Sequence, residues 1–177
     1  MTLTQALKKR KEYFKKLDDL KDKISRISAR MENQTAEYAN EPIQINEWIQ
    51  ARKDIIQEIE KLTYAIQVTN IITQVTIELN NKSITKSIAE WMQRRDKLAK
   101  LELESYTSLT DRNLRAQTLK QPDSNGAQVI QVVFNYNPKE RDVNTELFRT
   151  EPNTIDSVLE TINATTDIVE GKIFKVA

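Results

Sequence analysis

The first 120 residues contain no glycine and a single proline, so long stretches of this chain carry no residue that stops a helix. Apolar residues in these stretches recur at steps of three and four, which is the spacing of one face of a helix. In the first stretch they are Leu3, Leu7, Phe14, Leu17, Leu20, Ile24, Ile27 and Met31. This pattern predicts a helix from about residue 4 to about residue 33, about 45 Å long and typical of a coiled-coil-like hairpin.

A connection and two further helices are predicted before residue 120. Residues 35–45 show little periodicity and include the one proline of this region, which predicts the first connection. A second helix is expected from an N-cap at Asn46 toward Asn70. A third helix, as long as the first, is expected to begin after a cap at Ser83 or Thr85.

Residues 71–82, between these two helices, are ambiguous. Val75, Ile77 and Leu79 alternate with polar residues as in a strand, but the apolar residues of the segment also fit a helix. We expect the end of the second helix followed by an extended loop.

The composition changes in the last third of the chain, where residues 121–126 give the strongest turn signal. Residues 128–136 are rich in Val, Ile, Phe and Tyr, which predicts a strand. Residues 143–149 are a candidate second strand. Pro152 is expected near the start of a fourth helix that ends at Gly171.

The predicted fold is therefore mainly α, a long antiparallel bundle of three to four helices with a small β-hairpin or sheet in the C-terminal third. Residues 1–120 form the bundle, and residues 121–177 form the β element and a C-terminal helix that packs on it, together one structural unit. The net charges of residues 1–30, 31–80, 81–120 and 121–177 are +6, −5, +4 and −4. Their alternation favours packing of the first helix against the second, and of the third against the C-terminal part.

The residue types that the chain lacks exclude most familiar site chemistry. It has no Cys and no His, which removes disulfides, thiolate nucleophiles, imidazole bases and Cys/His metal sites. Its two glycines, Gly126 and Gly171, cannot form a P-loop or a dinucleotide-binding motif. The net charge of +1 gives no general attraction to nucleic acid or to an anionic membrane. We therefore expect no cofactor, no metal and no catalysis.

The same features bear on location and partners. The N-terminal residues have no apolar segment of the kind found in secretory signals, and no run of eighteen apolar residues could span a membrane. The sequence therefore predicts a protein of the cytoplasm, or of the interior of a virus particle. The expected partner is another protein, either further copies of this chain or an assembly partner, and neither a nucleic acid nor a membrane is expected.

An arginine interrupts the apolar spacing of each of the first three predicted helices. These residues are Arg10, Arg52 and Arg95, with Glu12, Asp54 and Asp96 as nearby carboxylates. An arginine among apolar residues must reach a carboxylate or extend to water, so the three could form polar layers that fix helix register or an oligomer interface. The alternative is that each lies at the edge of its stripe and reaches solvent. Asn70, late in the second helix, could likewise fix the register, with a position at the helix terminus as the alternative.

The predicted strand at residues 128–136 carries apolar side chains on both faces, with Phe134 and Tyr136 on one of them. A lone hairpin would leave such a surface exposed, so the fourth helix or another subunit should cover it. Phe134 and Tyr136 are therefore candidate interface residues, and Phe134→Asp is expected to disrupt folding or assembly.

One short motif resembles an enzyme signature. Ser83-Ile84-Thr85-Lys86 matches the Ser-x-x-Lys of serine acyltransferases, in which the lysine helps to activate the serine. The companion Ser-Asp-Asn and Lys-Thr-Gly motifs are absent from the chain. The same residues are explained by the start of a helix after a loop, so an enzyme with a Ser/Lys or carboxylate site is the weakest hypothesis.

Several short stretches together resemble the septicolysin-like family of uncharacterised small bacterial helical proteins. They are Leu3-Thr4-Gln5-Ala6-Leu7 with Arg10, then Ile66-Gln67-Val68-Thr69-Asn70, Ser83-Ile84-Thr85, Arg94-Arg95-Asp96, and Leu159-Glu160-Thr161-Ile162-Asn163-Ala164-Thr165-Thr166. The family name implies a membrane-active, cytolysin-like protein. The chain departs from the family at residues 71–82, which lack the expected glycines, and it shows no long apolar tract for a pore.

The function predicted from these observations is that of a non-catalytic, oligomerising structural or interaction protein, a component of a larger assembly such as a virion or another multi-subunit particle. A membrane-active protein is the first alternative, and an enzyme is the second.

Overall fold

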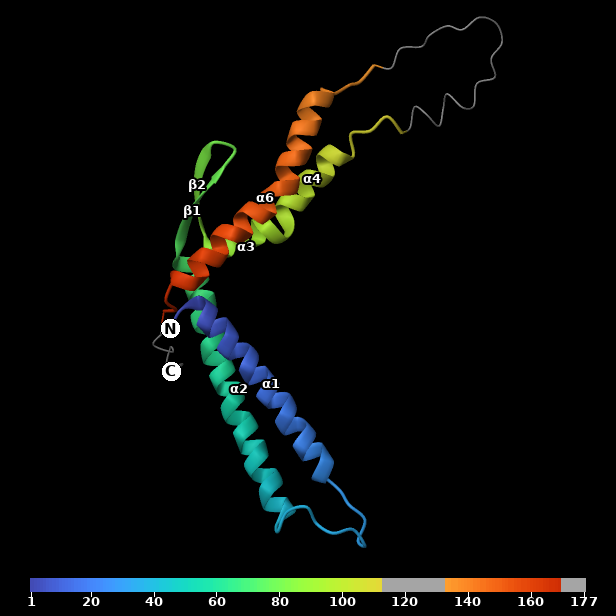
Figure 1. The fold of residues 1–177 in the computed structure, drawn as a ribbon, viewed down its shortest axis with the longest axis vertical. Coiled ribbons are helices and arrows are strands. Elements are labelled where there is room, and N and C mark those ends of the chain that lie inside the picture. Colours follow the sequence, from blue (N-terminus) through green and yellow to red (C-terminus); the bar gives the residue numbers. More distant parts are fainter. Residues whose placement is uncertain (113–132, 170–177) are drawn as a thin grey trace, which may run out of the picture. The chain divides into compact units, whose positions relative to one another are not determined.

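The computed structural model describes residues 1–112 and 133–169 (Figure 1). Over these residues the protein is mainly helical and contains a two-stranded antiparallel sheet. It divides into two compact units, one made of residues 1–73 and 160–177 and the other of residues 74–159. The mainly α class is confirmed. The predicted boundary after residue 120 lies outside the described residues.

Two long antiparallel helices make up most of the first unit, α1 (Leu3–Ile27) and α2 (Glu41–Ile72), which lie side by side in Figure 1. Thr2 caps α1 in a capping box with Gln5, which satisfies amide groups that the first turn leaves unpaired. The prediction that Asn46 begins the second helix was wrong. Asn40 is the N-cap, and its side chain accepts from the Ile43 amide.

The position of its proline is compatible with the early start of α2. Pro42 lies in the first turn, where a residue without an amide hydrogen leaves no helical hydrogen bond unmade. The prediction that this proline lies in a loop is therefore wrong, because it is part of the helix.

The residues by which α1 and α2 face each other follow a strict alternation of three and four, the heptad spacing of a coiled coil. We call this line the seam. On α1 its members are Leu3, Ala6, Arg10, Tyr13, Leu17, Leu20, Ile24 and Ile27, all buried or half-buried. On α2 they are Ile45, Trp48, Arg52, Ile55, Ile59, Leu62, Ile66 and Thr69, also buried or half-buried. Leu7 and Phe14, which were predicted to belong to this apolar line, lie exposed beside it.

A short segment after the last helix joins the start of the chain to α2. Asp167 and Thr2 form an isolated antiparallel bridge, in which the Leu3 amide donates to the Thr166 carbonyl at 2.9 Å. Buried Thr69 accepts the Val169 amide at 2.9 Å on its hydroxyl, which in turn donates to a carbonyl one turn earlier in α2. The hydroxyl therefore fixes the segment to the helix.

The second unit begins with a β-hairpin of β1 (Gln74–Leu79) and β2 (Lys82–Ser87). Its two-residue turn is Asn80-Asn81, with φ of 56° and 60°, as the type I′ turn of a tight hairpin requires. The strand interpretation of residues 74–79 is correct, and the expected loop is wrong. The predicted helix start at Ser83 or Thr85 is also wrong, because both residues belong to β2.

A helical stretch follows the hairpin, shorter than α1 although an equal length was predicted. It comprises α3 (Ile88–Gln93), a π-helical turn η1 (Arg94–Leu98) and α4 (Ala99–Thr107). Ser87, the last residue of β2, caps α3 in a capping box with Glu90. Buried Trp91 donates from its indole nitrogen to the Val75 carbonyl at 2.9 Å, which ties α3 to β1.

The last helix, α6 (Pro138–Thr165), is much longer than predicted. Asn137 accepts the Lys139 and Glu140 amides on its side chain, and Pro138 follows in the first helical position. The second strand predicted at residues 143–149 is therefore wrong, since these residues are helical.

Two further predictions for this part of the chain have different outcomes. Pro152 lies inside α6 rather than near its start, and the helix ends at Thr165, before Gly171. Most of the strand predicted at residues 128–136 lies outside the described residues, and residues 133–136 are not in a strand.

Candidate functional site

The most connected side chain among the described residues of the second unit is Arg94, in η1. Its Nε donates to Glu151 Oε1 at 2.5 Å and its Nη2 to Glu151 Oε2 at 2.9 Å, a bidentate pair. Its Nη1 donates to Glu102 Oε1 at 2.5 Å. The guanidinium carbon lies 5.6 Å from the centre of the Phe148 ring, which stacks on Tyr106. We call Arg94, Glu102, Phe148 and Glu151 the arginine cluster.

The π-helical turn explains why Arg94 and Glu102 meet. Residues eight apart in a regular α-helix are about 80° out of phase around the axis. The Ala99 amide donates to the Arg94 carbonyl five residues earlier, so η1 holds one more residue per turn. Eight steps then rotate about as far as seven do in an α-helix, which leaves the two residues only about 20° apart.

The arginine cluster is closed to solvent at Glu151. Glu151 is 4% exposed, and both of its oxygens accept from Arg94. The pKa of Arg94 is raised, first by its hydrogen bond to Glu151 and then by its hydrogen bond to Glu102, so it stays protonated at every physiological pH. A buried, fully paired carboxylate and a permanently charged guanidinium form a structural tie between η1, α4 and α6.

Arg95 pairs with Asp96, the nearby carboxylate named in the sequence analysis, and with a second carboxylate. Its Nε donates to Asp96 at 2.7 Å, and its Nη1 donates to Asp156 of α6 at 2.6 Å. These contacts raise the pKa of Arg95, with the hydrogen bond to Asp96 as the largest cause. The basic third helix therefore pairs with the acidic C-terminal part, as the block charges predicted.

The other seam arginines lie in the first unit. Arg52 of α2 donates to the Leu17 carbonyl of α1, so its partner is a backbone oxygen, whereas Asp54 accepts from Gln50. Arg10 is half-buried on the seam of α1, and no salt bridge joins it to any other described residue. Asn70 is half-buried at the end of α2, beside the buried Thr69.

Phe134 and Tyr136 lie in the non-helical residues that lead into α6. Their rings meet edge-on with centroids 5.4 Å apart, and Phe134 is 44% exposed. Arg141 of α6 lies over the Tyr136 ring and also donates to the Leu109 carbonyl at 3.1 Å. The hydrogen bond to Leu109 connects the start of α6 to the residues just after α4.

The residues of the Ser-x-x-Lys motif do not form a reactive pair. Ser83 and Lys86 are three positions apart in β2, so they point to opposite faces of the hairpin. Ser83 lies near Glu78 at 3.5 Å, and Lys86 lies over the Trp91 ring.

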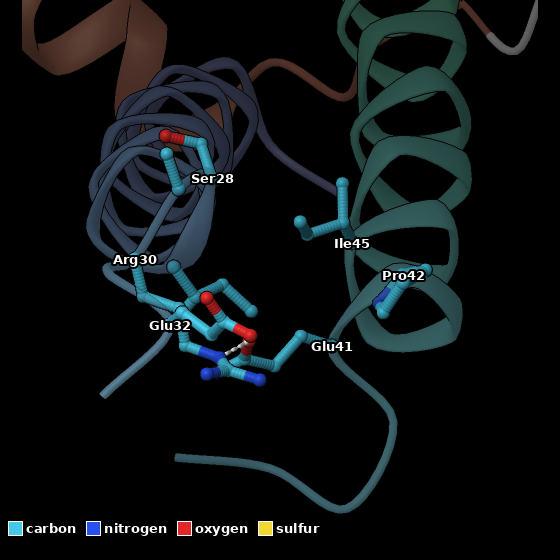
Figure 2. Close-up of a pocket in the computed structure, with 8 residues that line it drawn as sticks. Ser28, Arg30, Glu32, Glu41, Pro42 and Ile45 are labelled. Carbon is cyan, nitrogen blue, oxygen red and sulfur yellow. Dashed lines mark hydrogen bonds and ion pairs between the residues drawn. The ribbon is translucent and has the colours of Figure 1, made fainter. Parts of the chain in front are cut away.

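An open recess of about 460 Å³ lies where α1 ends and α2 begins (Figure 2). In the close-up Arg30 and Glu41 face each other, and Arg30 Nε lies 3.1 Å from Glu41 Oε2. Arg30 also donates to the Gln34 carbonyl, and Glu41 accepts the Glu37 amide. The charged groups of the recess thus hold the connection between the helices in place.

The two sides of the α1–α2 hairpin differ sharply. One side carries Lys9, Lys16 and Lys23 of α1 and Glu58 of α2. The pKa of Glu58 is lowered mainly by its hydrogen bond to Lys61, and the nearby charge of Lys9 lowers it further, which places Lys9 and Glu58 on the same side. We call this the charged side.

The opposite side carries large exposed apolar residues from both helices. In the heptad of each helix they occupy the position directly after a seam residue, away from the charged side. They are Leu7 (37% exposed), Phe14 (51%), Ile49 (38%) and Ile56 (50%). We call this the apolar side.

Within residues 1–112 and 133–169, no group of three or more acidic residues is placed to hold a metal ion. The same residues include no helix that is long and apolar enough to cross a membrane.

Comparisons with known proteins give a fold and no activity. No family model and no curated protein matches the chain. The fold is similar to a solved structure described as a functionally unknown conserved protein from Corynebacterium diphtheriae. The two chains are 18% identical, with a TM-score of 0.57, over 96% of this chain and 99% of the other. The resemblance to the septicolysin-like family stays a prediction.

Proposed function

We propose that the protein is a non-catalytic, oligomerising structural component of a larger assembly. The observation that carries this proposal is the apolar side of the α1–α2 hairpin, where Phe14 and Ile56 are each about half exposed. Scattered apolar residues on a surface need no explanation, but a row contributed by two adjacent helices marks a surface used for association.

The polar groups support the same proposal. Arg94, Arg95 and Arg52 are each committed to a partner in another helix or to a neighbouring carboxylate, so they stabilise helix packing. The open recess in Figure 2 is lined by an ion pair that anchors a loop. Such an arrangement suits a rigid scaffold more than a site that must bind and release a small molecule.

A membrane-active protein remains the alternative, because a row of exposed apolar residues could also contact lipid. Lysines of α1 beside that row would assist binding to anionic lipid. Leakage of dye from vesicles of phosphatidylcholine and phosphatidylserine at a 3:1 ratio distinguishes the two functions. We expect no leakage, and leakage at micromolar protein would favour the alternative.

The native mass of the purified chain, measured by light scattering across a concentration series, tests the proposal. We expect a fixed multiple of the 20.6 kDa chain mass. A monomer at every concentration, in buffer of physiological salt, would contradict self-association and would direct the search to a different protein as partner.

A further inference from the structure

The apolar side of the α1–α2 hairpin has the residue pattern of a helix bundle. A two-stranded coiled coil needs apolar residues only at the two seam positions of each heptad. Helices that face the core of a bundle carry a third apolar position in each heptad, next to the seam. Leu7 and Phe14 of α1 and Ile49 and Ile56 of α2 occupy that third position, and Lys21 and Thr63 occupy it one heptad further on. The middle of the hairpin therefore resembles half of a four-helix bundle.

Phe14 and Ile56 lie at the same level of the hairpin. Arg52 of α2 donates to the Leu17 carbonyl of α1, which puts these two residues within reach of one arginine side chain and so at about the same level. One turn further along α2 is Ile56, and one turn back along α1 is Phe14, because the helices are antiparallel (Figure 1). These two side chains form the centre of the apolar side.

The charges next to this centre are self-complementary. On α1, Lys11 precedes Phe14 by three residues and Asp18 follows it by four, so both lie beside it on the helix surface. On α2, Lys53 and Glu60 flank Ile56 at the same two spacings. All four charged residues are exposed. Each helix therefore presents a positive end and a negative end, arranged symmetrically about its central apolar residue.

We infer that a second copy of this chain docks on the apolar side and completes an antiparallel four-helix bundle. A two-fold axis at the level of Phe14 lays each α1 antiparallel on the α1 of the other copy, and each α2 on the other α2. Lys11 of each copy then meets Asp18 of the other, and Lys53 meets Glu60. Such an isologous contact needs only one self-complementary surface, which the charges provide. This inference rests on the proposed self-association and names its surface.

Phe14→Glu in the full-length chain tests the apolar centre. A charge at the centre of a bundle interface has no partner there, so we expect the dimer dissociation constant to rise at least 100-fold in sedimentation equilibrium. Lys23→Glu, on the charged side of the same helix, is the matched control and should leave the constant within about threefold. Far-ultraviolet circular dichroism checks that both variants keep their helices.

A charge swap tests the antiparallel register. Lys11→Asp alone and Asp18→Lys alone should each weaken the dimer about tenfold, because each places like charges opposite one another twice. The double variant Lys11→Asp/Asp18→Lys should restore the wild-type constant. Within one chain the two residues are about 10 Å apart along the helix, too far for an ion pair, so restoration reports a contact between copies.

The outcomes separate this inference from the proposed function. A wild-type oligomer that survives Phe14→Glu would overturn the inference while leaving self-association intact, with its interface elsewhere. Single charge variants that bind normally, or a double variant that stays weak, would overturn the register. A wild-type chain that remains monomeric would overturn both proposals.

Discussion

At the scale of single residues, this protein places its polar side chains where they join helices. Glu151 gives both oxygens to Arg94, and Thr69 gives its hydroxyl to Val169. Each is buried, and each contacts a residue that is distant in sequence. A buried polar group with a partner contributes little net stability, but removing the partner leaves an unsatisfied group whose desolvation is not offset. These residues should therefore be sensitive to conservative substitution.

Glu151→Gln tests this for the arginine cluster. The substitution keeps the shape of the side chain but removes the charge that faces Arg94, so we expect the free energy of unfolding in urea to fall by about 3 kcal/mol. Glu102→Gln is the matched control, because Glu102 is 46% exposed and its pair is screened by water. We expect a loss of less than about 1 kcal/mol for the control. Equal losses for the two variants would contradict the importance of burial.

The cap of α3 makes a prediction about pH. The pKa of Glu90 is lowered from its ordinary value of 4.5, first by the hydrogen bond from the Ser87 hydroxyl, then by the Ser87 amide. A carboxylate with a lowered pKa in the folded state stabilises the fold above the ordinary value, and this contribution disappears as the pH falls through the folded-state pKa.

Glu90→Gln, which cannot ionise, removes that pH dependence. We expect the wild type to be more stable than this variant at pH 7, with the difference shrinking between pH 4.5 and pH 2.5 in urea unfolding. A difference that is the same at all three pH values would show that the charge of Glu90 has no part in the cap.

At the scale of elements, the start of α1 was predicted correctly because its apolar period is regular and nothing in its sequence competes with a helix. Its predicted end near residue 33 was wrong, because the helix ends at Ile27 and Met31 lies exposed beyond it. The β-hairpin was missed because Val75, Ile77 and Leu79 fit two periods and Asn80-Asn81 is a weaker turn signal than Asn-Gly. Three possible caps, Ser83, Thr85 and Ser87, follow in alternation, and only the register of the hairpin selects the last. The local sequence pattern therefore does not show which of the three residues caps the helix.

The start of α6 and the partners of Arg94 could not be predicted from local sequence pattern either. Pro152 suggests a helix start, since proline favours the first turn, yet it lies inside α6, next to Glu151, which contacts Arg94. The sequence did not indicate a role for Arg94 beyond its place in the stretch that resembles the septicolysin-like family. Its partners are 8 and 57 positions away, and the nearer one is aligned only by a π-helical turn. Arg95 was predicted as a candidate because it interrupts an apolar spacing and lies next to Asp96.

The π-helical turn predicts an unusual tolerance to deletion. Removing exposed Lys97 from η1 should yield a regular α-helix in which Arg94 and Glu102 keep the same phase. We expect this variant to fold, with a Tm within a few degrees of the wild type. Removing exposed Gln57 from α2 instead shifts half of the seam by about 100° and should abolish cooperative unfolding. Equal damage from both deletions, followed by circular dichroism, would contradict the phase argument.

At the scale of the whole molecule, the central claim is that the α1–α2 hairpin is completed by a second copy of the chain. Lys9, Lys16 and Lys23 lie on one side of it, and the exposed apolar residues of both helices lie on the other. The apolar side is centred on Phe14 and Ile56, with flanking charges that match their own two-fold image. The distant structural neighbour, whose function is unknown, shares the fold and adds no evidence about partners.

The most direct test is a distance between two copies, and the absence of cysteine makes it simple. A single spin label on Ser25→Cys, near the end of α1, lies about ten residues from the level of the proposed axis. Antiparallel packing about that axis places the two labels about 30 Å apart along the helices, at 1.5 Å per residue. Double electron–electron resonance should therefore give a distance of about 30 Å or slightly more. A much shorter distance, or no dipolar coupling at a concentration where the wild type is multimeric, would contradict the account.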